Sequence, residues 1–276
     1  MLRSMFAGVS GLRSHQTMMD TVGNNISNIN THGYKSSRTT FQDALYQTIR
    51  GATGAEDDQG GVNPTQVGLG ARVASIDQNF SQGGLQTTNR ATDMAIDGEG
   101  FFIVSDETNP DPGQMMFTRN GAFSFDEQGR LVTGNGQFVM GGDEGNEIIQ
   151  PDDDVDVSQL SDISVGNDGV ITGRMSDGSE ETIGTLALAT FNNANGLTRV
   201  GNSMFAQSVN SGGPEIGPPG GDTGAGVTQG GVLEMSNVDL AEEFTNLIMA
   251  QRGFQANSRT ITTSDEMLQE LVNLKR

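Results

Sequence analysis

The chain has 276 residues, with no Cys, no Trp, 39 Gly, 34% apolar residues and a formal net charge of −20. The lack of cysteine excludes disulfides, zinc–thiolate sites and thiol nucleophiles, and the low apolar content favours thin β layers over one thick core. The charge is concentrated in residues 51–235, which carry −21, against +3 for residues 1–50 and −2 for residues 236–276, so no nucleic-acid partner is predicted.

The N-terminal segment is predicted to form a helix over residues 4–30, about 40 Å long. Its apolar residues recur at a seven-residue spacing, at Met5, Leu12, Met19 and Ile26. Gly and charged residues interrupt the segment, and no stretch of the chain approaches about 18 consecutive apolar residues, so neither a cleavable signal peptide nor membrane insertion is predicted. The chain is expected to be cytoplasmic or exported by a route that does not read such a signal.

Four asparagines stand near the end of this helix, at Asn24, Asn25, Asn28 and Asn30, where they lower helix propensity. A frayed helix end would explain them. Alternatively, their amides hydrogen-bond neighbouring subunits in a buried polar seam. Gly33 then predicts the end of the helix, and the pattern over residues 34–47 fits either an extended segment or a short helix.

The middle of the chain has the pattern of β-strands joined by turns. Residues 51–63 are predicted to form a flexible loop. Asn120-Gly121 between two apolar runs predicts a hairpin over residues 117–125. The similar segments 81–85 and 228–232 are either matched strands or a chance similarity. Tight turns are predicted at 134–136 and 167–169, and further strands at 71–79, 93–96, 101–104 and 186–191.

The C-terminal segment, residues 236–276, has no Pro and a single Gly, and is predicted to form one helix of about 55–60 Å, capped by Ser236. A helix of that length with one apolar seam requires a partner, and the N-terminal helix is the candidate. The seam is formed by Leu240, Leu247, Phe254, Ile261 and Leu268, widened by Phe244, Ile248, Leu271 and Val272.

The predicted fold is therefore α+β, with long N- and C-terminal helices paired as a coiled-coil-like stalk and a central all-β domain. The expected divisions are an N-terminal helix (1–35), a connecting segment with a loop (36–80), an acidic β-rich domain (81–231) and a C-terminal helix (232–276).

No catalytic site, metal site or cofactor is predicted, and the chain is not expected to be an enzyme. His15 and His32 are the only histidines, and neither lies within a serine or carboxylate motif. Gly98-Glu99-Gly100 lacks the third glycine of a dinucleotide-binding loop. The run Asp152–Asp156 lacks the alternating ligands and the glycine of a calcium loop, so a solvated acidic loop is preferred there.

Residues 24–35 resemble the N-terminal signature of the bacterial flagellar rod and hook family, N-N-(I/L)-(S/A)-N-x-x-T-x-G-(F/Y)-K. The resemblance extends in order over nearly the whole chain. The C-terminal signature of the family is matched by residues 236–240, 250–258 and 263–271. The β-domain motifs that the family shares are similar to residues 97–102 and 117–121.

This resemblance implies a structural subunit whose terminal helices line a hollow tube through helical contacts between copies, with the acidic β domain outside. The candidate self-assembly residues are the seven-residue-spaced residues together with Asn24, Asn25 and Asn28. Leu247, Phe254 and Ile261 are expected to carry the inner-tube contact. Implied partners are further copies of the chain, neighbouring rod and hook-junction proteins, a hook or rod cap protein, and the flagellar export apparatus. The implied location is the basal body or the hook, extracellular or spanning the periplasm.

Within the family, residues 261–276 resemble the ending of short hook proteins. The total length and the loop at 46–65 resemble the distal rod protein, in which an insertion near that place is associated with a straight, rigid tube. We expect a short hook protein that acts as a flexible universal joint and transmits torque, with the distal rod protein, a rigid drive shaft, as the alternative. A competing class is a monomeric secreted β module whose helices pair only with each other.

Overall fold

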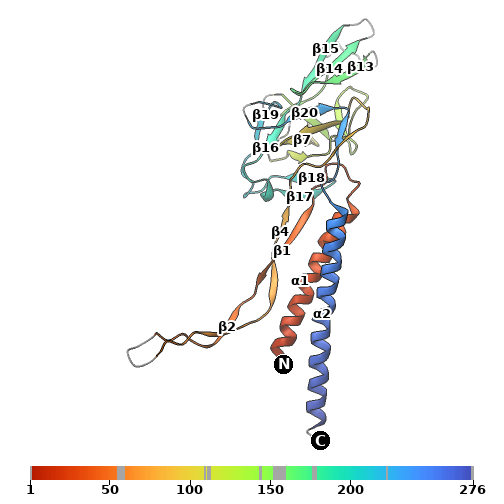
Figure 1. The fold of residues 1–276 in the computed structure, drawn as a ribbon. Coiled ribbons are helices and arrows are strands. Elements are labelled where there is room, and N and C mark those ends of the chain that lie inside the picture. Colours follow the sequence, from red (N-terminus) through yellow and green to blue (C-terminus); the bar gives the residue numbers. More distant parts are fainter. Residues whose placement is uncertain are drawn as a thin grey trace. The chain divides into compact units, whose positions relative to one another are not determined.

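The computed structural model describes residues 2–54, 60–108, 110, 113–142, 145–151, 160–175, 179–221 and 223–274. The chain folds as two compact units, whose elements are drawn in Figure 1. The helical unit comprises Met1–Ser27, Ser37–Gln78 and Asp239–Arg276, and the β unit comprises Asn28–Ser36 and Asn79–Val238. The predicted α+β class, with a long helix at each end and a β-rich middle, is confirmed. The coiled-coil-like character of the helix pair stays a prediction.

The helical unit is built on α1 (Leu2–Ser27) and α2 (Leu240–Asn273). α2 begins after Asp239, whose carboxylate accepts hydrogen bonds from the backbone N–H groups of Ala241 at 2.8 Å and Glu242 at 3.3 Å. The N-cap is therefore Asp239 and not Ser236, because this carboxylate reaches the free N–H groups of the first turn.

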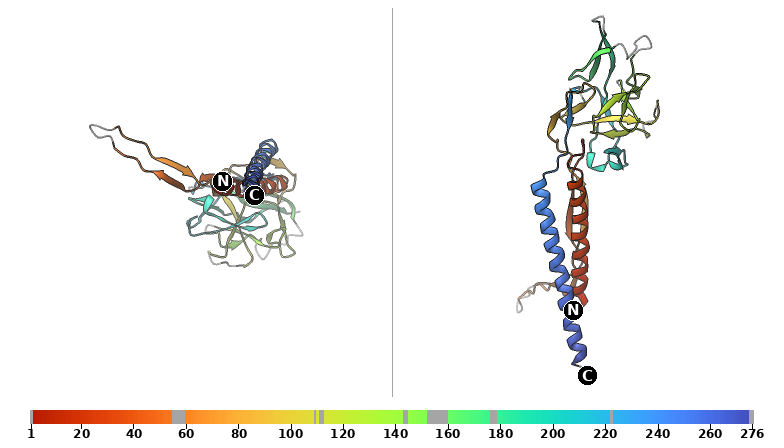
Figure 2. Two further views of the ribbon diagram at one scale, coloured as in Figure 1. Left: turned by 90° about the horizontal axis from the view of Figure 1, so that it is seen from below. Right: turned by 90° about the vertical axis from the view of Figure 1, so that its right-hand side faces the viewer.

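α1 and α2 pack against each other at small residues. A side chain added at Gly8 would lie 3.2 Å from Ile261 Cγ1, and one added at Gly253 would lie 2.5 Å from the His15 ring. Since Gly8 precedes His15 while Ile261 follows Gly253, the helices run antiparallel (Figure 2). α2 has 34 residues against 26 in α1, and it continues past the start of α1.

A two-stranded antiparallel sheet packs on α1 within the same unit. It consists of β1 (Ser37–Asp43) and β4 (Ala71–Gln78), with Ser37 opposite Gln78. Thr39 on β1 and Thr21 on α1 join their hydroxyl groups at 2.9 Å. The segment 34–47, for which the sequence left two conformations open, is therefore mainly extended.

A second antiparallel pair, β2 (Tyr46–Arg50) and β3 (Thr65–Gly68), continues from β1 and β4 as a narrow ribbon. Thr53 and Val62 form one further bridge between its two arms. Within the predicted flexible loop at 51–63, the described residues 51–54 and 60–63 thus continue the two arms of the ribbon and are joined by this one bridge. Residues 55–59 lie outside the described residues.

The β unit contains a ten-stranded sheet with the order β17-β18-β8-β7-β11-β10-β9, to which β12, β16 and β19 attach. The β unit also contains a separate three-stranded sheet, β13-β14-β15, and two separate antiparallel strand pairs, β20–β6 and β21–β5. Its elements are β5 (Leu85–Thr87), β6 (Met94–Asp97), β7 (Phe101–Ser105), β8 (Met116–Thr118), β9 (Phe123–Phe125), β10 (Leu131–Thr133), β11 (Phe138–Gly141), β12 (Glu147–Ile148), β13 (Leu160–Val165), β14 (Val170–Met175), β15 (Glu180–Thr185), β16 (Leu188–Thr190), the 3₁₀ helix η2 (Ala194–Gly196), β17 (Thr198–Gly201), β18 (Met204–Ala206), β19 (Glu215–Gly217), β20 (Val227–Gly230) and β21 (Val232–Glu234).

The core of the β unit lies on both sides of β7, whose five residues are all buried. Successive residues of a strand point to opposite faces, so Phe102 and Val104 enter one core cluster while Phe101 and Ile103 enter the other. Phe102 meets Phe123 edge-on, with ring centroids 5.2 Å apart. The modest apolar content of the chain is thus concentrated around a central strand.

Most predicted strands are confirmed, at β4, β6, β7 and β16. The predicted tight turns at 134–136 and 167–169 join the antiparallel pairs β10–β11 and β13–β14. The two similar segments at 81–85 and 228–232 lead into β5 and β21, which pair with each other. The segments themselves are not matched strands, because residues 81–84 lie outside any strand whereas residues 228–230 belong to β20, which pairs with β6.

The hairpin predicted around Asn120-Gly121 is wrong. β8 pairs with β7 and β18, whereas β9 pairs with β10. The Met94 N–H donates to the Gly121 carbonyl at 3.0 Å, and a Cβ at Gly121 would overlap the carbonyl oxygen of Met94. Glycine is needed at position 121 because the backbone of Met94 lies directly against it. This contact overrides the local turn signal of Asn120-Gly121.

We expect Gly121→Ala to destabilise the β unit by about 1–3 kcal/mol, because the new methyl group has to displace the Met94 backbone. Gly134→Ala, in the turn between β10 and β11, is the matched control, since no heavy atom lies within 4 Å of its Cβ position. Urea unfolding of the full-length chain measures both variants. Equal unfolding midpoints would contradict the tight packing at Gly121.

Candidate self-assembly site

The residues predicted from the seven-residue spacing lie mostly half-buried on the two helices. Ile261 lies against Gly8 of the same chain, and the most buried residues of α2 are the small Ala250 and Ser264. At Ile261, therefore, the spacing marks packing within one chain, and contact with neighbouring copies remains a prediction. The half-buried set comprises Met5, Leu12, Met19, Ile26, Leu247, Phe254, Ile261 and Leu268.

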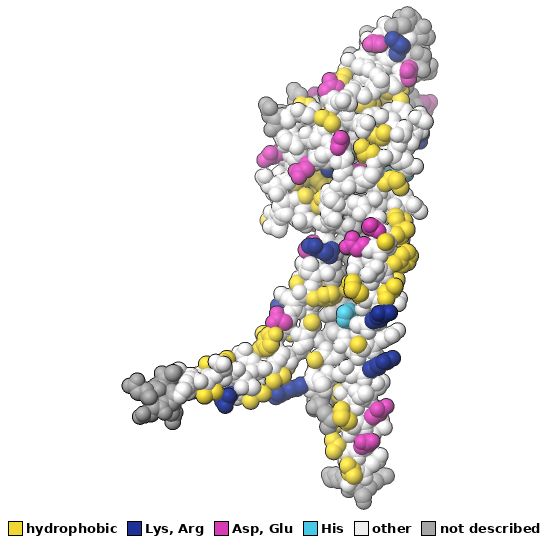
Figure 3. Space-filling model, in the orientation of Figure 1, with side chains coloured by type: hydrophobic (Ala, Val, Ile, Leu, Met, Phe, Trp, Pro, Cys, Tyr) yellow, Lys and Arg dark blue, Asp and Glu magenta, His cyan; other side chains and the backbone are white. Residues whose placement is uncertain are grey.

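A second apolar row on α2 is exposed. Leu240, Phe244 and Ile248 are 40%, 49% and 49% exposed, and their four-residue spacing places them on one side of the helix. We name these three residues the outer stripe; hydrophobic side chains gather along this part of α2 in Figure 3. Exposed apolar rows of this kind mark interaction surfaces. The end of α2 is also apolar and exposed, at Met267, Leu271, Val272 and Leu274.

Asn25 uses its amide within the chain. It is buried, and its Nδ2 donates to the Ser37 carbonyl at 2.8 Å and to Glu243 Oε1 at 2.7 Å, while its Oδ1 accepts from the Ser37 N–H at 3.0 Å. The end of α1, the start of β1 and the first turn of α2 are thereby joined. Burial raises the pKa of Glu243, and the hydrogen bond from Asn25 opposes that shift.

The other two asparagines among the candidate self-assembly residues have different surroundings. Asn24 is exposed on α1. Asn28 is half-buried in the β unit, where its Oδ1 accepts a hydrogen bond from Thr31 Oγ1 at 3.2 Å. The three asparagines therefore differ in burial and in partners, and their contacts with neighbouring subunits remain a prediction.

The β2–β3 ribbon exposes every one of its residues. Large apolar side chains stand on it and beside it, with Leu45 79%, Tyr46 55% and Ile49 62% exposed. A two-stranded ribbon alone is only marginally stable in water, and its free edges offer N–H and C=O groups to another chain. The ribbon is thus a second surface suited to association.

Three charged side chains, which we name the Glu234 cluster, are buried together in the β unit. The carboxylate of Glu234 pairs with Lys35 Nζ at 2.6 Å and with Arg119 Nη1 at 3.3 Å. Two cations face one carboxylate, so backbone carbonyls accept further hydrogen bonds from them. The Ser81 carbonyl accepts from Lys35 Nζ at 2.9 Å, and the Gly98 carbonyl accepts from Arg119 Nη2 at 2.6 Å. Sequence reasoning missed this cluster, although Lys35 and Arg119 both lie in family motifs.

Burial is the largest influence on both cations and lowers the pKa of Lys35 and the pKa of Arg119, while attraction to Glu234 opposes both shifts. The carboxylate also accepts the Gly83 N–H at 2.9 Å. Buried charges are tolerated when they are paired and hydrogen-bonded. The cluster therefore fixes residue 35, the 117–121 motif and β21 in one arrangement.

The part of the chain that the structure describes has no other site of recognisable chemistry. There, no group of three or more His, Asp or Glu side chains is placed to hold a metal ion, and no helix is long and apolar enough to cross a membrane. His15 is half-buried beside Phe41, with ring centroids 6.0 Å apart. The acidic run Asp152–Asp156 lies outside the described residues.

Comparison with known proteins points to the flagellar axis. Three family models match: "Flagella basal body rod protein" over residues 5–35, "Flagellar hook protein FlgE/F/G D1 domain" over 95–173, and "Flagellar basal body rod FlgEFG protein C-terminal" over 229–274. The flagellar basal-body rod protein FlgG of Bacillus subtilis is 44% identical over 100% of both chains. In Borreliella burgdorferi, FlgG is 36% identical and the flagellar hook protein FlgE is 30% identical, each over 100% of both chains.

The fold and these matches define a structural subunit of the flagellar axis. The chain belongs to the flagellar basal-body rod and hook protein family. The predicted membership is confirmed, and with it the general expectation of a polymeric axial assembly beside other flagellar components.

We expect Glu234→Gln to destabilise the β unit by about 3–5 kcal/mol, since it leaves two buried cations without a counter-charge. Glu180→Gln is the matched control, because it removes the exposed pair Arg174–Glu180 (3.1 Å) and should cost less than about 1 kcal/mol. Thermal unfolding of the full-length variants measures the difference. A Glu234→Gln chain that melts with the wild type would show that the cluster is dispensable.

Proposed function

We propose that this chain is a rod subunit that assembles helically, through its terminal helices, into a straight and rigid part of the flagellar axis. The observation that carries this proposal is the β2–β3 ribbon. It occupies the place at which the resemblance associates an insertion with a rigid tube, and it projects apolar side chains into solvent. In a polymer, such a ribbon pairs with a neighbouring copy and restrains sliding between subunits.

Chain length supports the rod over the hook. The alignments with FlgG of Bacillus subtilis and of Borreliella burgdorferi span 277 and 278 positions, close to the 276 residues of the chain. The alignments with the hook proteins FlgE of Borreliella burgdorferi and of Treponema pallidum span 447 and 469 positions. A hook protein of that size carries long segments that this chain lacks.

The hook, which the sequence favoured, is the second candidate. Its support is the 30% identity to FlgE of Borreliella burgdorferi and the resemblance of residues 261–276 to short hook proteins. In that case the outer contacts would slide as the hook rotates, and torque would pass through a flexible joint.

The polymer contact is proposed at the outer stripe and at the exposed end of α2. Burying these side chains against neighbouring helices removes apolar surface from water, which favours association. The half-buried residues Leu247, Phe254 and Ile261 contribute by shaping the helix pair that presents the exposed rows. Because each copy uses one surface to bind a different surface of the next, the contacts build an open helical array.

The remaining family expectations belong to the same proposal. The chain would leave the cell through the flagellar export apparatus and join neighbouring rod and hook-junction proteins and a cap protein in the basal body. Its role is mechanical and not enzymatic. The competing class, a monomeric secreted β module, would use α1 and α2 only to pair with each other and would leave the outer stripe without a partner.

We expect Ile248→Asp to abolish sedimenting polymers while leaving the thermal unfolding of the monomer unchanged, because Ile248 is exposed on the single chain. Ile261→Asp should instead destabilise the helical unit as well, since Ile261 lies against Gly8. Gln255→Asp, an exposed polar position on α2, controls for the added charge. Ile248→Asp chains that form polymers like the wild type would contradict the outer-stripe contact.

We expect removal of the ribbon to leave polymers that are curved instead of straight. Residues 45–69 can be replaced by an Asn-Gly turn, because the Ala44 N–H already donates to the Gly70 carbonyl at 2.7 Å and would close β1 and β4 as a hairpin. A full-length variant with Leu45, Tyr46 and Ile49 changed to Ser separates the effect of surface from that of length. Electron microscopy decides: straight polymers from the shortened chain would remove the argument for a rod.

A further inference from the structure

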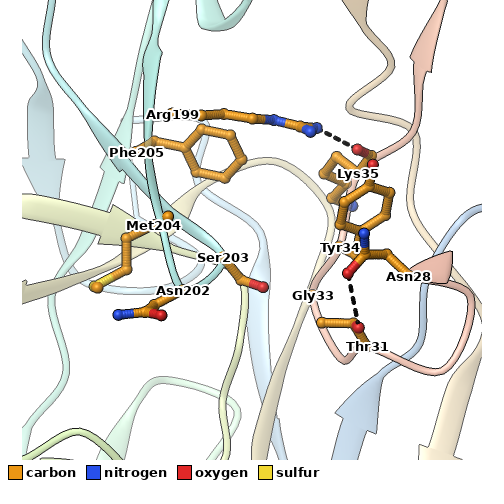
Figure 4. A pocket seen from close by; sticks show the side chains of 11 residues that line it. Asn28, Thr31, Gly33, Tyr34, Lys35, Arg199, Asn202, Ser203, Met204 and Phe205 are labelled. Carbon is orange, nitrogen blue, oxygen red and sulfur yellow. Dashed lines mark hydrogen bonds between the residues drawn. The ribbon is translucent and has the colours of Figure 1, made fainter. Parts of the chain in front are cut away.

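A pocket of about 260 Å³ lies within the β unit between the N-terminal signature and the turn of a hairpin. Residues 28–35 form one wall, and the turn between β17 and β18 forms the other (Figure 4). Tyr34 and Phe205 supply apolar surface, while Asn202 and Ser203 stand on the hairpin wall. Of the candidate self-assembly residues, Asn28 lines this pocket, whereas the outer stripe and the β2–β3 ribbon do not.

The hairpin wall is held in an unusual backbone conformation. Asn202 and Ser203 have φ angles of +52° and +59°, a region that glycine occupies without cost. The carbonyl of Ser203 accepts a hydrogen bond from Thr118 Oγ1 at 2.9 Å, which keeps the turn in place. Asn202 and Ser203 thus place side chains at two positions where glycine would form the turn without strain. Backbone strain of this kind often occurs at binding sites.

Arg199 spans the two walls of the pocket (Figure 4). Its guanidinium donates to the Lys35 carbonyl and lies over the Tyr34 ring, 5.1 Å from the centroid, and 5.9 Å from that of Phe205. Its Nε is buried and has no hydrogen-bond partner. This Nε is enclosed by the protein and does not face the pocket, so the pocket's binding capacity rests on the charge of the guanidinium and not on its Nε.

Arg199 also differs in its electrostatic surroundings from most cations of this unit. Over the described residues, Lys35, Arg119, Arg130 and Arg174 each form an ion pair with a carboxylate, and Arg199 does not. The segment 51–235 carries a net charge of −21, so carboxylates are plentiful on every copy. Acidic surfaces that approach in a polymer repel unless a cation receives one of them.

We propose that this pocket binds a carboxylate side chain from the β unit of a second copy, with Arg199 as its counter-charge and Asn202 and Ser203 as hydrogen-bond partners. The carboxylate supplies the counter-charge that the guanidinium lacks among the described residues, and the methylene groups of an Asp or Glu side chain pack beside Tyr34. The inference rests on the proposed polymer and adds a polar contact between β units to the contact between helices.

The test measures the critical concentration for polymer formation of the full-length chain by sedimentation. Arg199→Gln removes the counter-charge, and Asn202→Asp adds a competing carboxylate in the pocket while keeping a residue type that tolerates positive φ. Arg90→Gln is the matched control, because Arg90 is exposed and forms no ion pair among the described residues. We expect the critical concentration to rise about tenfold for both pocket variants, the loss of one charge-assisted contact, and to stay unchanged for Arg90→Gln.

Thermal unfolding of each monomer separates a folding defect from a contact defect, and Asn202→Asp decides if Arg199→Gln melts early. Added salt should narrow the difference in critical concentration between the wild type and Arg199→Gln, because it screens an attraction that only the wild type has. If the wild type forms polymers and both pocket variants match it, the carboxylate contact is wrong and the rod proposal stands. If the wild type forms no polymer, the rod proposal fails and this inference fails with it.

Discussion

The buried carboxylate of Glu234 is the interaction on which the β unit depends. It binds Lys35 and Arg119 at once, and each of these three residues comes from a different part of the chain. A carboxylate in a dry interior is unstable without its cations, and the cations are unstable without it. The β unit is therefore complete only when the residues just after α1 and just before α2 are both in place.

Residues from both ends of the sequence also meet where the chain passes from the β unit to the helical unit, at Ser36 and Ser37. Asn237 accepts the Ser36 N–H at 2.8 Å in the β unit, and Asn25 binds both the N–H and the carbonyl of Ser37 in the helical unit. Two consecutive residues are thus fixed by asparagines from opposite ends of the sequence. An amide suits this role because it donates and accepts at once. The asparagine-rich signature is consequently part of the fold as well as a candidate for contacts between copies.

The sequence predicted the elements better than their partners. Seven-residue periodicity located both helices, and the turn signals located β10–β11 and β13–β14. The Asn120-Gly121 hairpin failed because Met94, from a distant segment, occupies the space beside Gly121. Glu234 follows two apolar residues in β21 and looks like the polar end of an exposed strand; nothing local to it indicates that residues 35 and 119 will surround it.

The helices show why a seam in a sequence does not identify its partner. A seven-residue spacing reports only that one side of a helix is covered, and here α1 of the same chain covers that side at Ile261. Once that side is occupied, the residues left for another copy are those the fold exposes, at Leu240, Phe244 and Ile248. Their four-residue spacing is present in the sequence. The sequence alone does not separate these residues from the seven-residue seam, because it does not show which side of α2 is covered by α1. An exposed apolar row gains stability only by association. Under the proposed function, the helix pair that a monomeric module would need as its core is therefore the scaffold that presents the contact surface of a polymer.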